Sequence, residues 1–318
     1  MAVVAVAAAA ATGSARGAFP GRPGLLVFQR DGDPNTQIWT MTADGRDARR
    51  LTSGYAAAIG PVWSPNGRRI AFERTGADVG GDTEVVTVDA RGKARKIVVA
   101  GTKVEGGTGV AWSPDGRRLV FLGVRKVPDA GLNVVGSDGR GLRALTTLGN
   151  RQVDYGPAWS PDGKRILFTR GNYAPLTQPG LRIKETLYVI DANGRNLRRL
   201  VTLRDLSAIG QTGVDFDYEA AWSPDGKRIA YTRADANGAA EIWTMNADGS
   251  DKRNLSRDPA DDRWPAWSPD GTKIVFSSRR DGNGELYVMD AVTGAPQTRV
   301  TSTPTDETRP DWQPLPKG

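Results

Sequence analysis

The 318-residue chain contains no cysteine and no histidine. It therefore cannot form a disulfide, a Ser-His-Asp triad, a cysteine nucleophile, or a zinc or copper site of the usual His/Cys kind. Long stretches in which apolar residues recur every three or four positions, the pattern of amphipathic helices, are also missing. These absences exclude several classes of enzyme and indicate a protein built mainly from strands.

Glycine and proline are abundant, at 39 and 20 residues, which is typical of an all-β protein with many tight turns. Charged residues make up 25% of the chain, as in an ordinary globular protein. The net charge of +7 permits binding to nucleic acid. The basic residues recur in the outer strand of each repeat described below, however, where they deter edge-to-edge pairing. We therefore expect no nucleic-acid partner.

The N-terminus has features of an export signal. Residues 2–11 are all apolar, and this run is too short to span a bilayer. Gly13 and Ala15 follow as small residues before a cleavage position, although no basic residue precedes the run. We expect residues 1–15 to be a signal peptide that is truncated at its start, followed by a linker at 16–24. The protein would then be periplasmic or extracellular. The alternative is a disordered alanine-rich tail.

One pentapeptide, Trp-Ser-Pro-Asp-Gly, organises the rest of the chain. It occurs complete four times and once with a single change at 63–67. A partial copy, Trp-Gln-Pro at 312–314, stands at the C-terminal end. The tryptophans that begin the copies are Trp63, Trp112, Trp159, Trp222, Trp267 and Trp312. Their spacing of 45 to 49 residues, with one interval of 63, indicates propeller blades of four strands each.

The unit that begins near Trp267 shows all four strands. Strands A, B, C and D are expected at 265–267, 273–276, 285–289 and 298–301. In the turn between A and B, proline fixes the first backbone angle, aspartate bonds back to the backbone, and glycine takes the left-handed conformation. The tryptophan is an apolar wedge that can fill the space between neighbouring blades. The pentapeptide is thus predicted to build the ring.

The two ends of the chain are out of phase with the repeat. Residues 25–28 form a strand B with no strand A before it, and residues 310–312 form a strand A with no strand B after it. We therefore predict an all-β fold at 25–314, a six-bladed β-propeller of four-stranded antiparallel blades. The strand around Trp312 would pair with the N-terminal blade and close the ring, which removes an open sheet edge. Residues 315–318 would be a tail.

Trp-Ser-Pro-Asp-Gly, together with Ile-Ala-Phe at 70–72, Ile-Trp-Thr-Met-Asn-Ala-Asp-Gly at 242–249 and Asn-Leu-Ser at 254–256, resembles the TolB-like family of six-bladed propellers. The resemblance covers about residues 25–314 and implies an exported, non-catalytic interaction module. Too few residues precede the first strand for the N-terminal α/β domain of the family's namesake, so a role in a Tol–Pal system stays open. The copy at 132–145 departs most, because its strand C lacks an aromatic residue.

Binding is expected on one face of the ring. In a four-stranded meander, the A–B and C–D turns share one face, and they are nearly uniform here. The B–C and D–A loops share the other face and differ in every blade, so we expect the partner there. The longest repeat interval adds residues to the loops at 171–184 and 204–219, which include Tyr173 and Arg182. We predict a partner-contact ridge at this pair of loops. The alternative is that the extra residues are insertions that the fold tolerates and that have no binding role.

A second candidate site is the position five residues before the repeat tryptophan, which is acidic in four blades. Strand A is innermost, so these acids and their aromatic or basic neighbours would line a funnel at the channel mouth, able to receive a cationic or peptide segment, or a metal ion. The alternative is that each acid caps its own D–A turn. The residues are Asp154, Tyr155, Asp217, Tyr218, Asp262, Trp264, Glu307 and Arg309, with Ala58 and Gly107 at the acid position of the other blades.

We expect no cofactor. Asp31, Asp33 and Asn35 begin like a calcium loop, but glycine is not sixth and glutamate is not twelfth, so no metal site is assigned. The sequence thus predicts a monomeric, non-catalytic scaffold of the bacterial envelope or extracellular space that binds a protein or peptide. One alternative is a glycan- or small-ligand-binding propeller. Another is a carboxylate-dependent glycoside hydrolase or lyase, since two carboxylates suffice for that chemistry.

Overall fold

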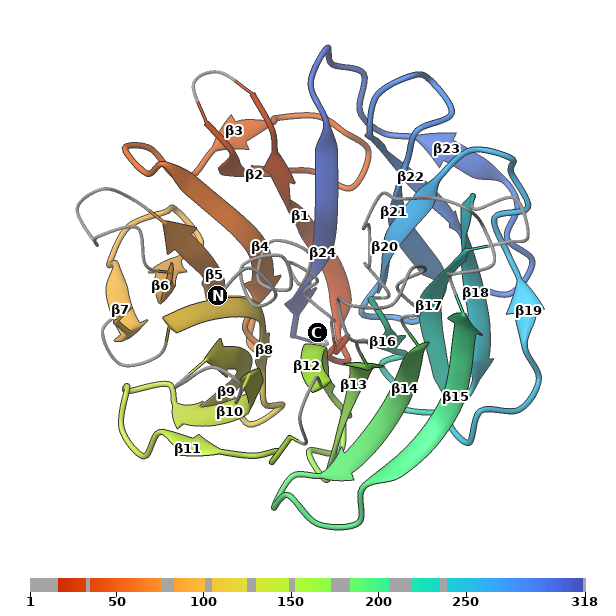
Figure 1. Cartoon of the computed structure of the whole chain (residues 1–318). Coiled ribbons are helices and arrows are strands. Elements are labelled where there is room, and N and C mark those ends of the chain that lie inside the picture. The colour runs from red at the N-terminus through yellow and green to blue at the C-terminus, as the bar shows by residue number, and fades with distance from the viewer. Residues whose placement is uncertain are drawn as a thin grey trace, which may run out of the picture.

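The computed structural model describes residues 17–32, 35–75, 83–100, 105–124, 130–148, 152–172, 184–205, 219–234 and 239–316. In this part of the chain, twenty-four strands form six four-stranded antiparallel sheets, and no helix is present. The sheets are arranged as blades around a central axis (Figure 1). The predicted six-bladed propeller is therefore confirmed.

Each blade is a meander that runs outward from the axis. Blade 1 consists of β24 (Glu307–Leu315), β1 (Arg22–Arg30), β2 (Gln37–Met41) and β3 (Arg49–Arg50). The other blades, in chain order and from the innermost strand outward, consist of β4 (Ala57–Trp63), β5 (Arg69–Thr75), β6 (Thr83–Asp89) and β7 (Lys96–Val99); β8 (Glu105–Trp112), β9 (Arg118–Val124), β10 (Ala130–Gly136) and β11 (Arg143–Ala144); β12 (Gln152–Trp159), β13 (Arg165–Asn172), β14 (Lys184–Asp191) and β15 (Arg198–Asp205); β16 (Ala221–Trp222), β17 (Arg228–Ala234), β18 (Ala240–Asn246) and β19 (Arg253–Asn254); and β20 (Asp262–Trp267), β21 (Lys273–Ser278), β22 (Glu285–Asp290) and β23 (Gln297–Arg299).

The two ends of the chain close the ring. Strand β24 pairs antiparallel with β1, with Trp312 opposite Leu26 and Leu315 opposite Arg22. The closure therefore follows the prediction. The pairing is longer than expected, because β1 begins at Arg22 rather than at Leu25 and β24 extends to Leu315.

Residues 17–21, which the sequence assigns to a linker, cross the end of the ring where the repeat tryptophans lie. Backbone N–H groups of this segment donate to the carbonyl of Trp222 at 3.3 Å and to that of Pro269 at 3.1 Å. Phe19 is 7% exposed and packs with Trp112 in the apolar cluster between two blades. The segment therefore forms part of the packed structure.

The repeat tryptophans lie between neighbouring blades, as their wedge shape predicts. Six apolar clusters fill the six blade interfaces, and each contains one of these tryptophans. Trp159, for example, packs against Leu132 of blade 3 and against Ile166 and Phe168 of its own blade. Every one of the six indole rings is 5% exposed or less. Burial of these rings holds adjacent blades together.

Candidate functional site

Three of the predicted funnel acids are buried and paired with arginine. Arg170 and Arg30 lie on strand B of the same blade, directly opposite the acid. Arg280 lies in the B–C loop, two residues beyond Ser278, the strand B residue opposite Asp262. The carboxylates are 0% exposed. The pairs are Asp154 with Arg170 (2.6 and 2.7 Å), Asp262 with Arg280 (3.0 Å) and Glu307 with Arg30 (2.7 Å). These carboxylates are thus engaged within their own blades.

Each of these arginines also lies over an aromatic ring of strand C, so that acid, guanidinium and ring form a layer that we call the acid–arginine–ring stack. Arg233 of blade 5 has the same ring contact. The guanidinium carbon lies 4.1 Å from the centre of Trp39 for Arg30, 5.2 Å from Tyr188 for Arg170, 4.6 Å from Trp243 for Arg233 and 4.4 Å from Tyr287 for Arg280. A ring face adds attraction for the cation, while the carboxylate neutralises its charge.

Asp154 and Glu307 also accept hydrogen bonds from hydroxyl groups of the preceding D–A loop, as the turn-capping alternative requires. The hydroxyl partners are Thr146 for Asp154 and Thr303 for Glu307. Asp262 instead pairs with the hydroxyl of Ser278 on the neighbouring strand, because Ser256 donates to Glu241. Burial raises the pKa of all three acids, against the opposing effect of the neighbouring arginines. The pKa of Asp262 rises to about 6, and that of Glu307, which also faces Glu285, rises to about 7.

In blades 1, 2, 3, 4 and 6, strand A carries a β-bulge three residues before the repeat tryptophan. The backbone there is left-handed, at φ 54° to 75°, and glycine fills the position in blades 2, 3 and 4. Trp264 and Arg309 occupy it in blades 6 and 1 at φ 58° and 54°, which non-glycine residues seldom adopt. The Arg309 guanidinium lies 5.4 Å from the Trp264 ring centre and 3.6 Å from Glu219. The bulge therefore brings together residues of three blades.

Glu73 of β5 joins this inner layer and was not singled out by the sequence. It is 1% exposed, it accepts the N–H of Gly109 from the next blade, and burial raises its pKa well above the usual value while Arg309 opposes that rise. The sequence offered a signal, because Glu73 lies inside strand B, directly after the apolar residues Ile70, Ala71 and Phe72. At the equivalent position, Gln29 of blade 1 accepts the N–H of Gly60. Both contacts link neighbouring blades.

The other predicted site residues divide into two groups. Tyr155 is 1% exposed and packs with Leu122 and Val153 between blades 3 and 4. Tyr173, Arg182, Asp217 and Tyr218 lie outside the residues that the structure describes, as does most of the predicted ridge. Asp33 of the calcium-like loop also lies outside them. Among the described residues, no group of three acidic side chains could hold a metal ion.

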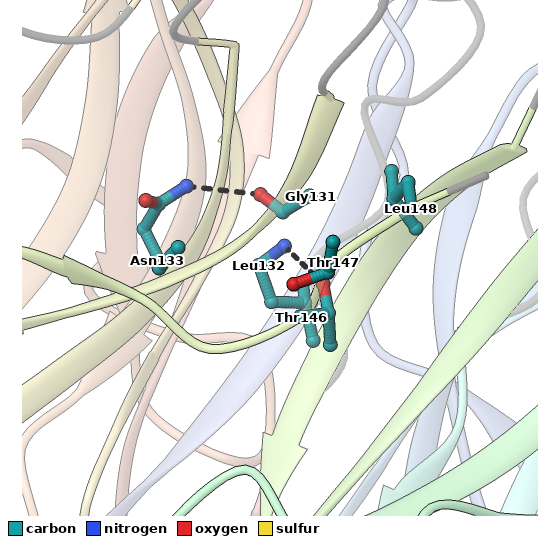
Figure 2. Close-up of a pocket in the computed structure, with 7 residues that line it drawn as sticks. Gly131, Leu132, Asn133, Thr146, Thr147 and Leu148 are labelled. Carbon is teal, nitrogen blue, oxygen red and sulfur yellow. Dashed lines mark hydrogen bonds between the residues drawn. The ribbon is translucent and has the colours of Figure 1, made fainter. Parts of the chain in front are cut away.

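Blade 3 contains a cavity of about 240 Å³ on the side of the variable loops (Figure 2). Its floor is the buried start of β10, at Gly131, Leu132 and Asn133. Its rim is Ala144 of β11 and the loop at 146–148. The Asn133 Nδ2 donates to the carbonyl of Gly131 at 3.0 Å, as Figure 2 shows. The sequence did not predict this cavity, although it marked the strand that forms the floor as the least typical copy.

Comparison with known proteins places this architecture in a family. The family described as TolB beta propeller domain matches residues 19–208 and 211–317. The Tol-Pal system protein TolB of Anaeromyxobacter dehalogenans is 47% identical over 45 residues, which is 14% of this chain and 10% of that relative. Matched sequence thus spans about a tenth of the curated relative.

Two solved structures share the fold over most of the chain. TolB from Acinetobacter baumannii superposes with a TM-score of 0.70 at 17% identity, covering 92% of this chain and 67% of that one. Kuenenia stuttgartiensis hydrazine synthase superposes with a TM-score of 0.71 at 14% identity, covering 93% and 48%. At such identities the likeness concerns the fold alone. The described residues include no helix long and apolar enough to cross a membrane.

Proposed function

The chain belongs to the TolB β-propeller family, and from that premise we propose that it is a non-catalytic scaffold of the bacterial envelope or extracellular space that holds a protein or peptide on its B–C and D–A loops. One observation carries the proposal, which is the contrast between the two faces. The A–B turns repeat one hydrogen bond from serine to aspartate, at 2.5 to 2.6 Å in the four complete copies. A face of near-identical turns offers little to distinguish partners, whereas loops that differ in every blade can do so.

The chemistry of the described acids supports a binding role rather than catalysis. Carboxylates with raised pKa are candidates for general acid catalysis. In Asp154, Asp262 and Glu307, however, the rise comes from burial, and each carboxylate is held by an arginine. A substrate could reach them only by disrupting the stack that packs the blade.

The predicted ridge offers the sharpest test of this function. Full-length protein and a variant lacking residues 172–181 are used to capture partners from an envelope extract, with cross-linking and mass spectrometry to identify what is bound. We expect the deletion to abolish specific capture while the melting temperature stays close to that of the wild type. The matched control is the double substitution Arg91→Glu and Arg195→Glu, two exposed residues in C–D turns of the opposite face.

The two faces then give opposite results. Loss of capture on deleting 172–181, with full capture by the C–D turn variant, supports the proposal. Unchanged capture by the deletion variant refutes the ridge. Loss of capture in the C–D turn variant alone would place the partner on the face of the A–B and C–D turns and refute the proposed function.

A further inference from the structure

The face of the A–B and C–D turns, which we call the turn face, carries the excess positive charge of the chain. It comprises the A–B turns and the C–D turns, each C–D turn being taken with the first residue of the strand that follows. Together these segments hold 21 Lys and Arg against 12 Asp and no Glu. The excess of nine is larger than the net charge of +7 of the whole chain. The segments are 64–69, 113–118, 160–165, 223–228 and 268–273 for the A–B turns, and 42–49, 89–96, 136–143, 191–198, 246–253 and 290–297 for the C–D turns.

The cations of the turn face are exposed and recur from blade to blade. One directly follows the glycine of the A–B turn in four blades, one stands in the C–D turn of five, and one begins strand D in five. The A–B turn aspartates are instead held within their turns, where they accept a serine hydroxyl and the N–H two residues further on. The exposed cations are Arg68, Arg117, Lys164 and Lys227; Arg46, Arg91, Arg140, Arg195 and Lys252; and Arg49, Lys96, Arg143, Arg198 and Arg253.

Three of the cations that begin strand D reach sideways along this face. Arg49, Lys96 and Arg143 each donate to a backbone carbonyl in the C–D turn of the next blade. The acceptors are Ala90 at 3.0 Å, Ser137 at 3.1 Å and Ala192 at 3.3 Å. These charged groups are therefore held at the level of the turns. They follow the circumference of the ring and do not form a groove across it.

Exposed aliphatic side chains lie among these cations. Within the described part of the chain, three large apolar residues are exposed, and two of them, Leu197 and Val292, stand in C–D turns. Leu197 is 43% exposed and directly precedes Arg198, and Val292 is 65% exposed. The third, Ile97, follows Lys96 in β7. Attraction between cations and acidic headgroups, together with burial of protruding apolar side chains, is what holds a protein on an anionic lipid surface.

The turn face is less suited to a nucleic acid. Proteins that hold single strands combine a basic groove with aromatic side chains on which the bases stack, and the turn segments contain no Trp, Tyr or Phe. Double-stranded DNA is read by a helix or a β-ribbon that enters a groove, whereas these segments are tight turns spread around a ring. A lipid surface can meet cations from all the blades at once. Each Lys or Arg near such a surface then strengthens binding about fivefold.

We propose that the turn face docks on an anionic lipid surface, with its cations against the headgroups and with Leu197 and Val292 inserted between them. The B–C and D–A loops then point away from the lipid and are open to the partner. This inference goes beyond the proposed function, because it concerns the opposite face of the ring. Lipid binding can fail while partner capture persists, and the reverse also holds.

Co-sedimentation of the full-length protein with vesicles tests the docking. The vesicles are pure phosphatidylcholine or an equal mixture of phosphatidylcholine and phosphatidylglycerol. We expect the wild type to bind the mixed vesicles at least about tenfold more tightly than the neutral ones. This preference should be lost in about 0.5 M NaCl, which screens the charges. The apolar run at 2–11 is present in every protein compared, so differences between variants report on the turn face.

Two double variants separate the faces of the ring. Arg117→Gln with Lys164→Gln removes two exposed charges from the turn face, and we expect it to bind the mixed vesicles about 25-fold more weakly than the wild type. Arg257→Gln with Arg279→Gln removes two exposed charges from the loops of the opposite face and should bind as the wild type does. A thermal melt of each variant establishes that it is folded. The proposal is overturned if the wild type does not prefer mixed vesicles, or if the two double variants weaken binding equally.

Val292→Ser distinguishes a lipid surface from a soluble polyanion. Loss of the exposed aliphatic side chain should weaken binding to the mixed vesicles about fivefold, because less apolar area is then buried between the headgroups. A polyanion that meets only the cations would not sense this change. Unchanged vesicle binding by folded Val292→Ser would assign the turn face to a polyanion, such as a nucleic acid or an acidic polysaccharide, and would overturn the proposal.

Discussion

Blades 3 and 4 are neighbours with the same strand order and the same register, yet their layers near the variable loops differ completely. In blade 4, Asp154, Arg170 and Tyr188 fill this layer with a buried ion pair and a ring. In blade 3, Gly107, Gly123 and Asn133 stand at the corresponding strand positions, so none of the three components of the stack is present. The difference teaches that the backbone ladder and the tryptophan wedge are sufficient to form a blade. The stack is an additional element that one blade can omit.

Removal of the repeat tryptophan that packs between these two blades should have the largest effect on stability. Trp159 is 0% exposed and packs between them, so Trp159→Ala removes apolar area from both and leaves a hole at the interface. We expect a loss of about 3–5 kcal/mol in the free energy of unfolding, measured by denaturant titration. Val292→Ala, at a residue that is 65% exposed, is the control and should change it by less than about 0.5 kcal/mol. Equal effects at the two positions would contradict the role of the wedge.

The next largest effect on stability is expected from disrupting the acid–arginine–ring stack of blade 4. Asp154→Ala leaves the Arg170 guanidinium, which is 8% exposed, without its carboxylate. We expect a loss of about 3 kcal/mol in the free energy of unfolding. The double variant Asp154→Leu, Arg170→Met replaces the pair with apolar side chains and should recover most of that loss, because no buried charge remains. If the single and double variants are equally unstable, the cost does not come from the uncompensated charge.

The stacks should also make stability depend on pH, whereas the corresponding positions of blade 3 cannot titrate. The folded protein raises the pKa of Glu307 from 4.5 to about 7, so the folded state binds more protons than the unfolded state between these values. Stability is therefore lost as the pH rises through this window. The contribution is about 1–3 kcal/mol, and Glu307→Gln should flatten the dependence between pH 5 and 7. An unchanged slope in that variant would assign the titration elsewhere.

The smallest expected effect is that of filling blade 3. Asn133→Tyr places a ring where blade 4 has Tyr188, and removes a buried carboxamide oxygen without a partner. We expect a gain of about 0.5–1 kcal/mol in the free energy of unfolding. The matched substitution Tyr188→Asn in blade 4 should destabilise the protein, because Arg170 loses its ring. Two changes of the same sign would show that the layers of the two blades are not equivalent.

The architecture was largely predictable from the sequence. The repeat tryptophans fix six blades, and the unmatched strands near Leu25 and Trp312 predict how the ring closes. The environment of the acids was less predictable, since Asp154 and Arg170 are sixteen residues apart and meet only through the pairing of two strands. The cavity was not predictable at all. Asn133 marks a missing ring in the sequence, but whether other side chains fill the gap, as Tyr55 does in blade 2, depends on packing between elements.

The central claim is that the variable B–C and D–A loops, and not the uniform turns, hold the partner, and capture by the deletion variant tests it most directly. The account predicts that the protein lacking residues 172–181 stays folded and loses specific capture, whereas the Arg91→Glu, Arg195→Glu variant captures as the wild type does. Unchanged capture by the folded deletion variant, or loss of capture in the turn variant alone, would contradict it.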